Sequence, residues 1–366
     1  MSMIGWLAQI TGALGLLGYG VNTVRYWVRF GKVDPVNGGI CRRIDGLIGP
    51  EDLVLTREGR LIVSCDGRSE DASVNPNGTI IGLRPDAPEE RVVLWDGGGN
   101  SFHPHGLDYF VDPRTGAEYL FVIDHRGTHD AVMIFTVDEA ALTLIQEVTA
   151  SDTTSLNDLA AVSKDQFYVT SDHNSKSPMV KTVSDYLRLP TGYVLYFDGV
   201  RLLPAASGIS YANGIALDVD KQRLYVASML RDKLIEYERV PPTGTLRKTG
   251  SIALQGSPDN ITVAGDGGLV VAVHPKILHL ARQRRERSFR APSMILYISP
   301  ASNSGARSCV TLYADPGENL AAASVAVKSG ERLFVGSVYD DHLVICDIPT
   351  VFDSSVAPGP MLSLAK

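Results

Sequence analysis

The chain has 366 residues, of which 44% are apolar, and its formal net charge at pH 7 is −7. That length permits two or three domains, and the apolar fraction suffices for a large hydrophobic core. The acidic balance gives a nucleic-acid partner no general electrostatic support, because nucleic-acid binding uses a basic surface.

The N-terminal segment is uncharged and mostly apolar. No charged side chain occurs before Arg25, and residues 4–19 are mostly apolar. The segment lacks the basic start and the small-residue cleavage site of an ordinary signal peptide. We therefore interpret residues 1–32 as an uncleaved signal anchor or membrane-associating segment. The alternative is a core helix that caps the rest of the protein.

Six short strand cores recur along residues 33–366, each flanked by turn-forming residues. Their closing valines are 59, 47, 57, 45 and 64 positions apart. They are Val63, Val122, Val169, Val226, Val271 and Val335. Strand repeats with a period near fifty are the signature of propeller blades, each a small antiparallel sheet. We therefore predict an all-β fold, a six-bladed β-propeller, preceded by an N-terminal hydrophobic helix.

A polar residue precedes each strand core at an equivalent place in the repeat. These residues are Glu51, Asp52, His105, Asn157, Asp158, Asn213, Asp259, Asn260 and, least like the others, Ser324. Equivalent positions of all blades lie on a ring around the propeller axis, so the repeat brings these side chains together. We predict that this ring is the functional site.

The ring offers carboxylate and amide oxygens but no thiolate. Oxygen ligands in this number favour calcium, whereas zinc would use His and Cys, and magnesium would keep more waters. Neither C-x-x-C nor H-E-x-x-H occurs in the chain. The alternative is that each pair of polar residues simply makes a turn between strands. Recurrence at one position of the repeat favours the metal site.

Eight short motifs support a resemblance to a known family. They are GPEDL at 49–53, PHGL at 104–107, IDH at 123–125, ND at 157–158, SDH at 171–173, ANGI at 212–215, PDNI at 258–261 and VHP at 273–275. In order and spacing they resemble the paraoxonases, calcium-dependent lactonases and arylesterases with a six-bladed propeller fold. The resemblance covers roughly residues 40 to 350.

The resemblance implies two Ca²⁺ ions, a histidine dyad and a disulfide. The catalytic calcium is expected at Glu51, Asn157, Asn213, Asp259 and Asn260. The structural calcium is expected at Asp52, Asp158 and the backbone carbonyl of Leu107. The dyad falls on His105 and His125, and the disulfide on Cys41 and Cys346, where it would close the ring.

The chemistry expected of such a site is hydrolysis. Calcium with an open coordination position can polarise an ester or lactone carbonyl. A neutral imidazole can take a proton from water while a second imidazole supports the first, so we assign His105 as the general base and His125 as its partner. No G-x-S-x-G motif occurs, which argues against a serine nucleophile.

Lactones are the leading substrate class and aryl esters the second, with organophosphates as promiscuous substrates. A different class of function is the alternative: a binding scaffold, or a cyclase or isomerase, in which calcium is only structural. Retention of His105, His125 and every calcium ligand favours hydrolysis.

Two further histidines lie at the ends of strand cores. His173 and His274 could line the same channel mouth, and the resemblance places His173 near the active-site wall. We assign both as candidate substrate contacts. A lone histidine is more often a hydrogen-bonded structural residue, and that alternative stands beside the assignment.

Three surface segments complete the expected architecture. Residues 175–189 predict a short amphipathic helix that forms a lid near the channel mouth. In the resembled family such helices associate with lipid. The alternative is that the apolar face of this helix packs on the propeller. Residues 66–77 predict a mobile loop that could cover the site. The basic run at 276–290 predicts a solvated insertion between two strands of one blade, with docking of an acidic partner or membrane as the alternative.

The signals for cellular location conflict. The positive-inside rule, applied to Arg25 and Lys32, places the propeller in the cytoplasm. Calcium supply, a disulfide and the glycosylation sequon at Asn77 point instead to the secretory lumen or the exterior. We favour a lumenal or extracellular protein that associates with membrane or lipid through its N-terminal segment. A second sequon at Asn260 is expected to be too buried for a glycan.

Overall fold

The computed structural model describes residues 19–28, 31–36, 40–67, 77–127, 129–150, 155–219, 222–302 and 305–348. Most of the predicted hydrophobic segment, and most of the predicted loop at 66–77, lie outside these residues. Among the described residues, no helix is both long and apolar enough to cross a membrane.

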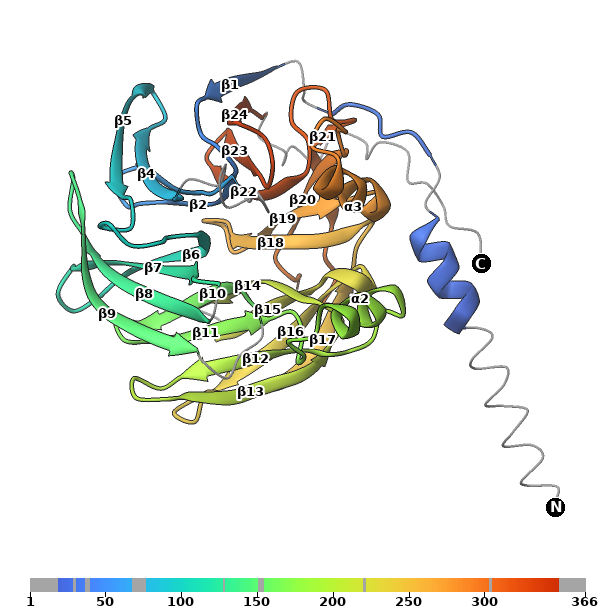
Figure 1. Ribbon diagram of the computed structural model, residues 1–366, viewed down its shortest axis with the longest axis horizontal. Coiled ribbons are helices and arrows are strands. Elements are labelled where there is room, and N and C mark those ends of the chain that lie inside the picture. Colours follow the sequence, from blue (N-terminus) through green and yellow to red (C-terminus); the bar gives the residue numbers. More distant parts are fainter. Residues whose placement is uncertain are drawn as a thin grey trace.

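Six four-stranded antiparallel sheets are arranged around one axis, so the predicted six-bladed propeller is confirmed (Figure 1). Blades 1 to 3 consist of β2 (Pro50–Leu55), β3 (Leu61–Cys65), β4 (Thr79–Arg84) and β5 (Ala87–Trp95); β6 (Pro104–Val111), β7 (Glu118–His125), β8 (Asp130–Val137) and β9 (Leu142–Ala150); β10 (Leu156–Ser163), β11 (Gln166–Ser171), β12 (Gly192–Phe197) and β13 (Leu202–Ile209). Blades 4 to 6 consist of β14 (Ala212–Asp218), β15 (Arg223–Ser228), β16 (Lys233–Val240) and β17 (Thr245–Ala253); β18 (Ser257–Val263), β19 (Leu269–His274), β20 (Ser293–Ile298) and β21 (Cys309–Asp315); β22 (Ala323–Ser329), β23 (Arg332–Ser337), β24 (His342–Asp347) and β1 (Cys41–Asp45).

The sixth blade closes the ring with a strand from the other end of the chain. Strand β1 pairs antiparallel with β24, and Cys41 lies opposite Cys346 in the register. The two cysteines form a disulfide, as the family resemblance implied. A covalent bond and a strand pair therefore join the first and last strands of the propeller.

The hydrophobic core lies between neighbouring blades. The predicted strand cores belong to the second strand of each blade, and all six closing valines are fully buried. At the first junction, for example, Ile62 and Ile80 of blade 1 pack with Leu120 and Phe135 of blade 2. Each such side chain contributes about 1.5–3 kcal/mol relative to an exposed one. Every blade is therefore stabilised by its neighbours rather than by its own sheet alone.

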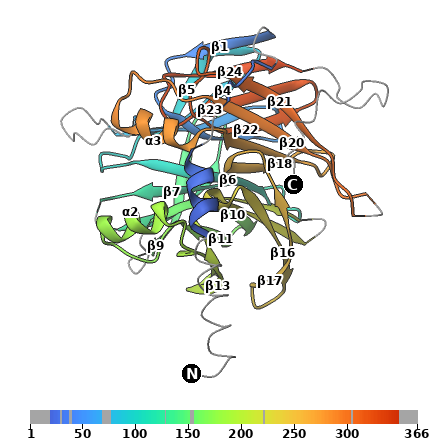
Figure 2. The same ribbon diagram turned by 90° about the vertical axis from the view of Figure 1, so that its right-hand side faces the viewer.

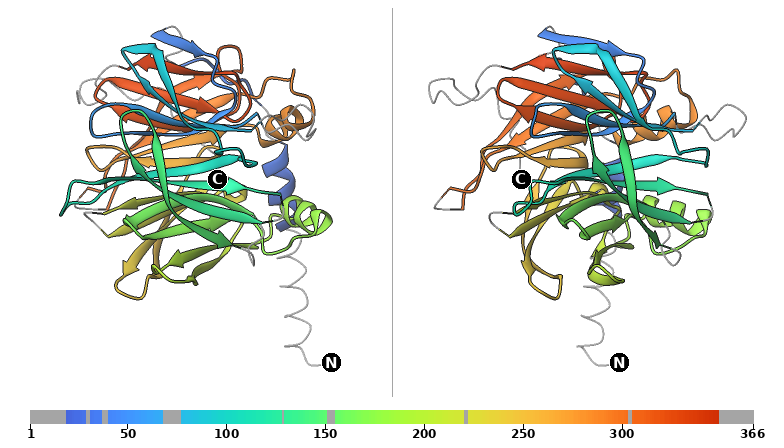
Figure 3. Two further views of the ribbon diagram at one scale, coloured as in Figure 1. Left: turned by 60° about the vertical axis from the view of Figure 1, so that its left-hand side comes forward. Right: turned by 90° about the vertical axis from the view of Figure 1, so that its left-hand side faces the viewer.

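Helical segments gather at one end of the propeller (Figures 2 and 3). They are residues 19–27, α2 (Pro178–Tyr186), η2 (Met229–Arg231) and α3 (Ile277–Arg285). Tyr26 packs with Met229 and Ile277, and Trp27 Nε1 donates to the Tyr186 carbonyl at 3.0 Å. The described part of the N-terminal helix therefore caps the propeller end.

The predicted lid forms helix α2 and presents its apolar side chains outward. Ser177 caps its N-terminus by accepting from Val180 N (3.5 Å), with Pro178 in the first turn. Met179 is 76% exposed, and Val180 and Val183 are also exposed. The alternative, in which this face packs on the propeller, is therefore wrong.

The basic run lies between β19 and β20 of blade 5, as expected, but it is not solvated throughout. It forms helix α3, in which Ile277 and Gln283 are buried. Gln283 Oε1 accepts from Ala291 N (2.8 Å), and Arg290 forms a bidentate ion pair with Asp340 (2.6 and 2.9 Å). These contacts fasten part of the segment to blades 5 and 6, while residues 282, 284–288 and 290 are exposed, as expected of a solvated insertion.

Candidate active site

The predicted ring residues lie near the start of the innermost strand of each blade, where the strand pairing is irregular. In all six blades the register shifts at this place, for example between Pro104 and Leu107 in β6 and between Pro258 and Ile261 in β18. A β-bulge of this kind interrupts the alternation of side chains and re-aims them. Because the polar pairs lie within strands, the alternative that they make hairpin turns is wrong.

Two glycines in the ring motifs allow neighbouring blades to touch. A Cβ atom on Gly106 would lie 2.7 Å from Asp158 Oδ1, and one on Gly214 would lie 2.4 Å from the Asp259 carbonyl oxygen. Side-chain carbons do not occupy such positions, so only glycine fits. The glycines of the His-Gly and Asn-Gly pairs are therefore required by close contacts between blades 2 and 3 and between blades 4 and 5.

A cavity of about 730 Å³ opens above the ring, beneath the helices. Of the predicted site residues it is lined by Glu51, His105, His125, Asn157, Asn213 and Asp259. Asn260 and the predicted structural-calcium residues do not line it. The structure thus brings residues from five blades to one place, as the repeat pattern required.

A chain of hydrogen-bonded groups crosses the floor of the cavity. His105 Nε2 lies 3.3 Å from Glu51 Oε1, and His105 Nδ1 lies 2.7 Å from His125 Nε2. His125 Nδ1 lies 2.7 Å from Asp130 Oδ1, and Asp130 Oδ2 accepts from Leu156 N at 2.7 Å. Asp130 is therefore the third member of the series behind the two histidines.

Asp130 was missed by sequence reasoning. Its only signal is its place, five residues after His125 at the first position of the next strand, which the β7–β8 pairing puts directly opposite His125. Burial opposes ionisation of Asp130, but hydrogen bonds from His125 and Leu156 hold its pKa below the usual value. Asp130 is therefore an anion at neutral pH.

The anionic Asp130 sets the proton positions in the histidine pair. Because Asp130 accepts from His125 Nδ1, His125 Nε2 is left to accept from His105 Nδ1. The remaining nitrogen, His105 Nε2, is then the basic one, and it is the nitrogen nearest Glu51. The arrangement can remove a proton from a molecule in the cavity.

The oxygens around the cavity fit a hard cation. Asn157 Oδ1 is buried and has no hydrogen-bond partner among the described residues. Asp259 Oδ2 accepts from His274 Nε2 at 2.7 Å, which leaves its second oxygen for another partner. Carboxylate and amide oxygens in this number suit calcium, and an orphaned buried acceptor is costly without a cation.

A second acidic group lies deeper in the ring. Asp52 and Asp158 are 4% and 3% exposed, and their Oδ2 atoms accept from the backbone of the next blade, at Leu107 N (2.7 Å) and Ile215 N (2.8 Å). Burial, together with repulsion from neighbouring carboxylates, raises the pKa of both well above the usual value. A bound cation would offset both effects, so these residues also fit a metal.

His173 and His274 lie behind the cavity wall rather than on it. His173 is buried between Asp172 Oδ1 (2.9 Å) and Asp185 Oδ1 (2.8 Å), and His274 contacts Asp259. Burial alone would lower the pKa of His173, but the bonds to the two carboxylates raise it to about 9. The groups that line the cavity here are Asp172, Asp185 and Asp259, and the two histidines hold these carboxylates through hydrogen bonds.

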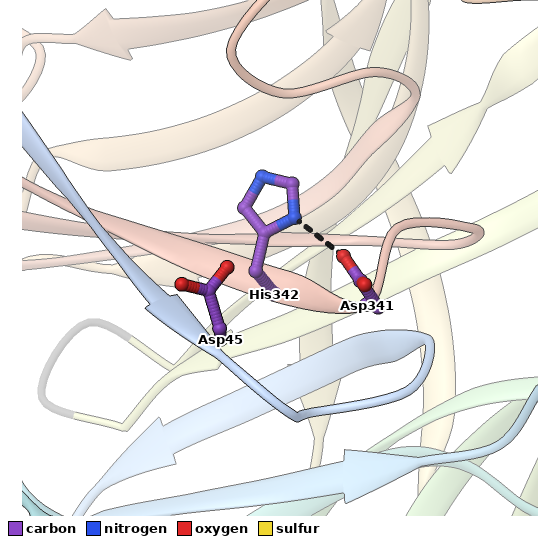
Figure 4. Close-up of side chains that lie close together, drawn as sticks. All are labelled: Asp45, Asp341 and His342. Carbon is purple, nitrogen blue, oxygen red and sulfur yellow. Dashed lines mark hydrogen bonds and ion pairs between the residues drawn. The ribbon is translucent and has the colours of Figure 1, made fainter.

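Asp45, Asp341 and His342 form another cluster of potential ligands on blade 6 (Figure 4). Arg43 Nη2 donates to Asp45 Oδ1 at 2.9 Å and lies 3.1 Å from His342 Nδ1, while His342 Nε2 donates to the Asn319 carbonyl at 2.7 Å. The guanidinium therefore already supplies a positive charge here, and we assign no metal to this cluster.

The two sequons differ in exposure. Asn77 is exposed just before β4, with its Nδ2 donating to the Asn100 carbonyl at 2.6 Å, whereas Asn260 is 3% exposed. Only Asn77 is accessible to a glycosylating enzyme.

Comparison with known proteins gives one family and one fold. The arylesterase family model matches residues 54–348. The chain is 29% identical to serum paraoxonase/arylesterase 2 of Bos taurus over 319 residues, covering 84% of this chain and 89% of that protein. It is also 29% identical to serum paraoxonase/arylesterase 1 of Homo sapiens over 351 residues, covering 90% and 98%.

Two solved structures are similar in fold. A luciferin-regenerating enzyme superposes with a TM-score of 0.52 at 15% identity, covering 85% of this chain and 95% of that chain. A gluconolactonase from Xanthomonas campestris superposes with a TM-score of 0.52 at 17% identity, covering 87% and 96%. At these identities the likeness concerns the propeller alone.

Proposed function

The chain belongs to the arylesterase family, and on that premise we propose that it is a hydrolase of lactones and aryl esters that uses calcium. The observation that carries the proposal is the series Glu51, His105, His125 and Asp130 at the floor of the cavity. It joins a basic nitrogen to the half-buried carboxylate of Asp130 through a second imidazole, beside oxygens suited to a cation.

Glu51, Asn157, Asn213, Asp259 and Asn260 would hold the catalytic calcium, and Asp52, Asp158 and the Leu107 carbonyl the structural one. When bound, the catalytic ion supplies Lewis acidity that polarises a carbonyl and stabilises negative charge on its oxygen. Zinc would need imidazole or thiolate ligands, which these positions do not provide.

The protein's own residues would move the proton. His105 Nε2 takes a proton from a water that attacks the carbonyl, and the positive charge that develops on the imidazole is stabilised through His105 Nδ1 and His125. Asp130 holds His125 in the required tautomer and balances that charge. The same proton can then return to the leaving alkoxide, so the cycle needs no covalent intermediate.

The lining of the cavity suits small or amphipathic substrates. Part of its upper wall is apolar, formed by Trp27, Met229, Leu230 and Ile277, and its floor is the polar ring. Lactones and aryl esters combine an apolar body with one polar carbonyl group and match this division. Organophosphate hydrolysis is proposed as a promiscuous activity of the same site.

We propose a lumenal or extracellular location, with glycosylation at Asn77. The Cys41–Cys346 disulfide is typical of oxidising compartments, and both reported relatives are named as serum enzymes. The apolar side chains exposed on α2, and the N-terminal segment, support association with a lipid surface.

The test is hydrolysis of γ- and δ-lactones and phenyl acetate by the purified chain, with calcium and after chelation. Calcium-dependent turnover that His105→Gln reduces by a factor of at least about 100 is expected, since general base catalysis contributes 10²–10⁴-fold. Full activity of His105→Gln would contradict the mechanism. No turnover, with chelation still lowering the melting temperature, would favour a binding protein or cyclase with structural calcium.

A further inference from the structure

Helix α3 supplies one wall of the cavity, and its arginines have no part in the chemistry described above. Residues 277, 278, 280, 281, 284 and 285 all line the cavity, a spacing that places them on one face of the helix. The face changes along its length. It begins with Ile277, Leu278 and Leu280 and ends with Arg284 and Arg285.

The apolar end of this face lies nearer the ring. The helix begins three residues after His274, which contacts Asp259, and Ile277 is buried against Met229. Arg284 and Arg285 lie about two turns further along, roughly 10 Å from Ile277 at 1.5 Å per residue, and both are exposed. The wall therefore runs from an apolar part beside Met229 to an exposed cationic part at Arg284 and Arg285, which we call the mouth. Figure 2 shows helix α3 at the same end of the propeller as α2.

The two arginines are not committed to structural contacts. Arg282 pairs with Glu286 (3.0 Å) and Arg290 with Asp340, but in the described part of the chain Arg284 and Arg285 have no ion-pair or hydrogen-bond partner. The ion pairs of Arg282 and Arg290 stabilise the position of the helix, and Arg284 and Arg285 take no part in them.

The carboxylates of the cavity have other partners. Asp172 and Asp185 lie on either side of His173, Asp259 contacts His274, and Glu51 lies beside His105. The positive field at the mouth is therefore available to a molecule that enters. Arginine presents a planar array of donors that matches a carboxylate or a phosphate.

We propose that Arg284 and Arg285 select substrates that carry an anionic group, a carboxylate or a phosphate, at the end of an apolar chain. The inference rests on the proposed function, because it places the lactone or ester carbonyl at the ring and the anion at the mouth. The apolar wall between them fits a chain that spans about 10 Å.

The experiment compares two δ-lactones that differ only at the end of an alkyl chain, one ending in a carboxylate and the other in its methyl ester. The readout is the ratio of their kcat/KM values. We expect the Arg284→Gln/Arg285→Gln double variant to lower this ratio at least about tenfold, since each lost charge-assisted bond costs of that order. The matched control, Arg282→Gln, should leave the ratio unchanged. Replacement of both residues by Lys should keep most of the preference, because the charge remains.

A double-variant ratio within twofold of the wild-type value would overturn the inference. If that unchanged ratio were accompanied by weaker binding to vesicles containing an anionic phospholipid, the arginines would be assigned to a lipid surface instead.

Failure of the proposed function would be recognised separately. If the wild-type protein hydrolyses neither lactone, calorimetric titration with the ring-opened hydroxy dicarboxylate decides the question. Weaker binding by the double variant would support an anion-selective mouth in a protein that is not a lactonase, and equal binding would contradict it.

Discussion

Replacing Asp130 by Asn tests whether the carboxylate behind the two histidines contributes to turnover. Asp130 contacts His125 Nδ1 and Leu156 N, both at 2.7 Å. Asparagine has the same shape and can accept one of these bonds through its oxygen, but it presents an NH₂ group to the other partner and carries no charge. The substitution therefore removes the anion with little change in packing.

The size of the effect follows from the type of bond. Charge-assisted hydrogen bonds contribute about 1.5–3 kcal/mol and neutral ones about 0.5–1.5 kcal/mol, so the loss is about 1–2 kcal/mol. This corresponds to a fall in kcat/KM of roughly 5- to 30-fold. The protonated, inactive form of the histidine pair is also less stable without the anion. The acidic limb of the pH–rate profile should therefore move to lower pH by about one unit.

The assay is kcat/KM for a δ-lactone between pH 5 and 9, with the melting temperature measured alongside. Asp138→Asn, an exposed carboxylate at the opposite end of the same blade, is the matched control and should change neither quantity. A reduced rate with an unmoved acidic limb would show that Asp130 only supports the local structure. A rate within twofold of the wild-type value would refute a catalytic contribution of Asp130 through His125 and His105.

The remaining predictions concern the ring closure, the two metal sites and the anchoring of α2. Cys346→Ser should lower the melting temperature strongly, because the chain-entropy model assigns about 5–6 kcal/mol at most to closing a loop of 305 residues, whereas Cys309→Ser, at an exposed free cysteine, should not. Asp259→Ala should abolish lactone turnover with a small stability loss, and Asp158→Ala should lower the melting temperature much more; equal losses would contradict two distinct sites. The folded-state pKa of His173, about 9, exceeds the ordinary value of 6.5, so its stabilisation is complete below about pH 6.5 and is lost as pH rises through 9. The shift corresponds to about 3 kcal/mol at most, which we reduce to about 1–2 kcal/mol because the Asp185 side chain is 33% exposed. Thermal unfolding of His173→Gln should therefore differ from wild type at pH 6 and converge with it near pH 9.5, and a constant difference would disprove the charge-based account.

The repeat pattern predicted the blades and the ring because both depend on local sequence. Each closing valine is fully buried at the junction between its own blade and the preceding one, so the period of the apolar cores was read directly from the chain. The ring residues recur at one bulge per blade, which is also a local feature. Where a residue's position in its own blade decides its position in space, sequence reasoning succeeded.

Residues placed by contacts between segments were harder to predict. Asp130 belongs to no ring motif and meets His125 only because β7 and β8 pair in this register. The basic run gave no sign that Gln283 and Arg290 would fasten it to the propeller end, since their partners Ala291 and Asp340 carry no distinctive pattern. The outward orientation of the apolar face of α2 likewise depends on its inner contacts, where Ser184 is buried and Asp185 contacts His173.

The buried carboxylates Asp52 and Asp158 couple metal binding to the assembly of the ring. Each accepts a hydrogen bond from the backbone of the next blade, so removing either one breaks a junction between blades as well as a metal site. The two contributions can be separated. Protein without calcium retains the junction bond but also the repulsion that raises the pKa of both groups, so its stability should rise as pH falls below neutrality. Calcium competes with those protons, and the stabilisation it gives should therefore be larger at pH 7.5 than at pH 5. Asp158→Ala would lose the junction bond and its own share of this pH dependence, while the share of Asp52 would remain. A variant that lost only the calcium effect would show that the hydrogen bond from Ile215 N to Asp158 holds the blades together without the metal.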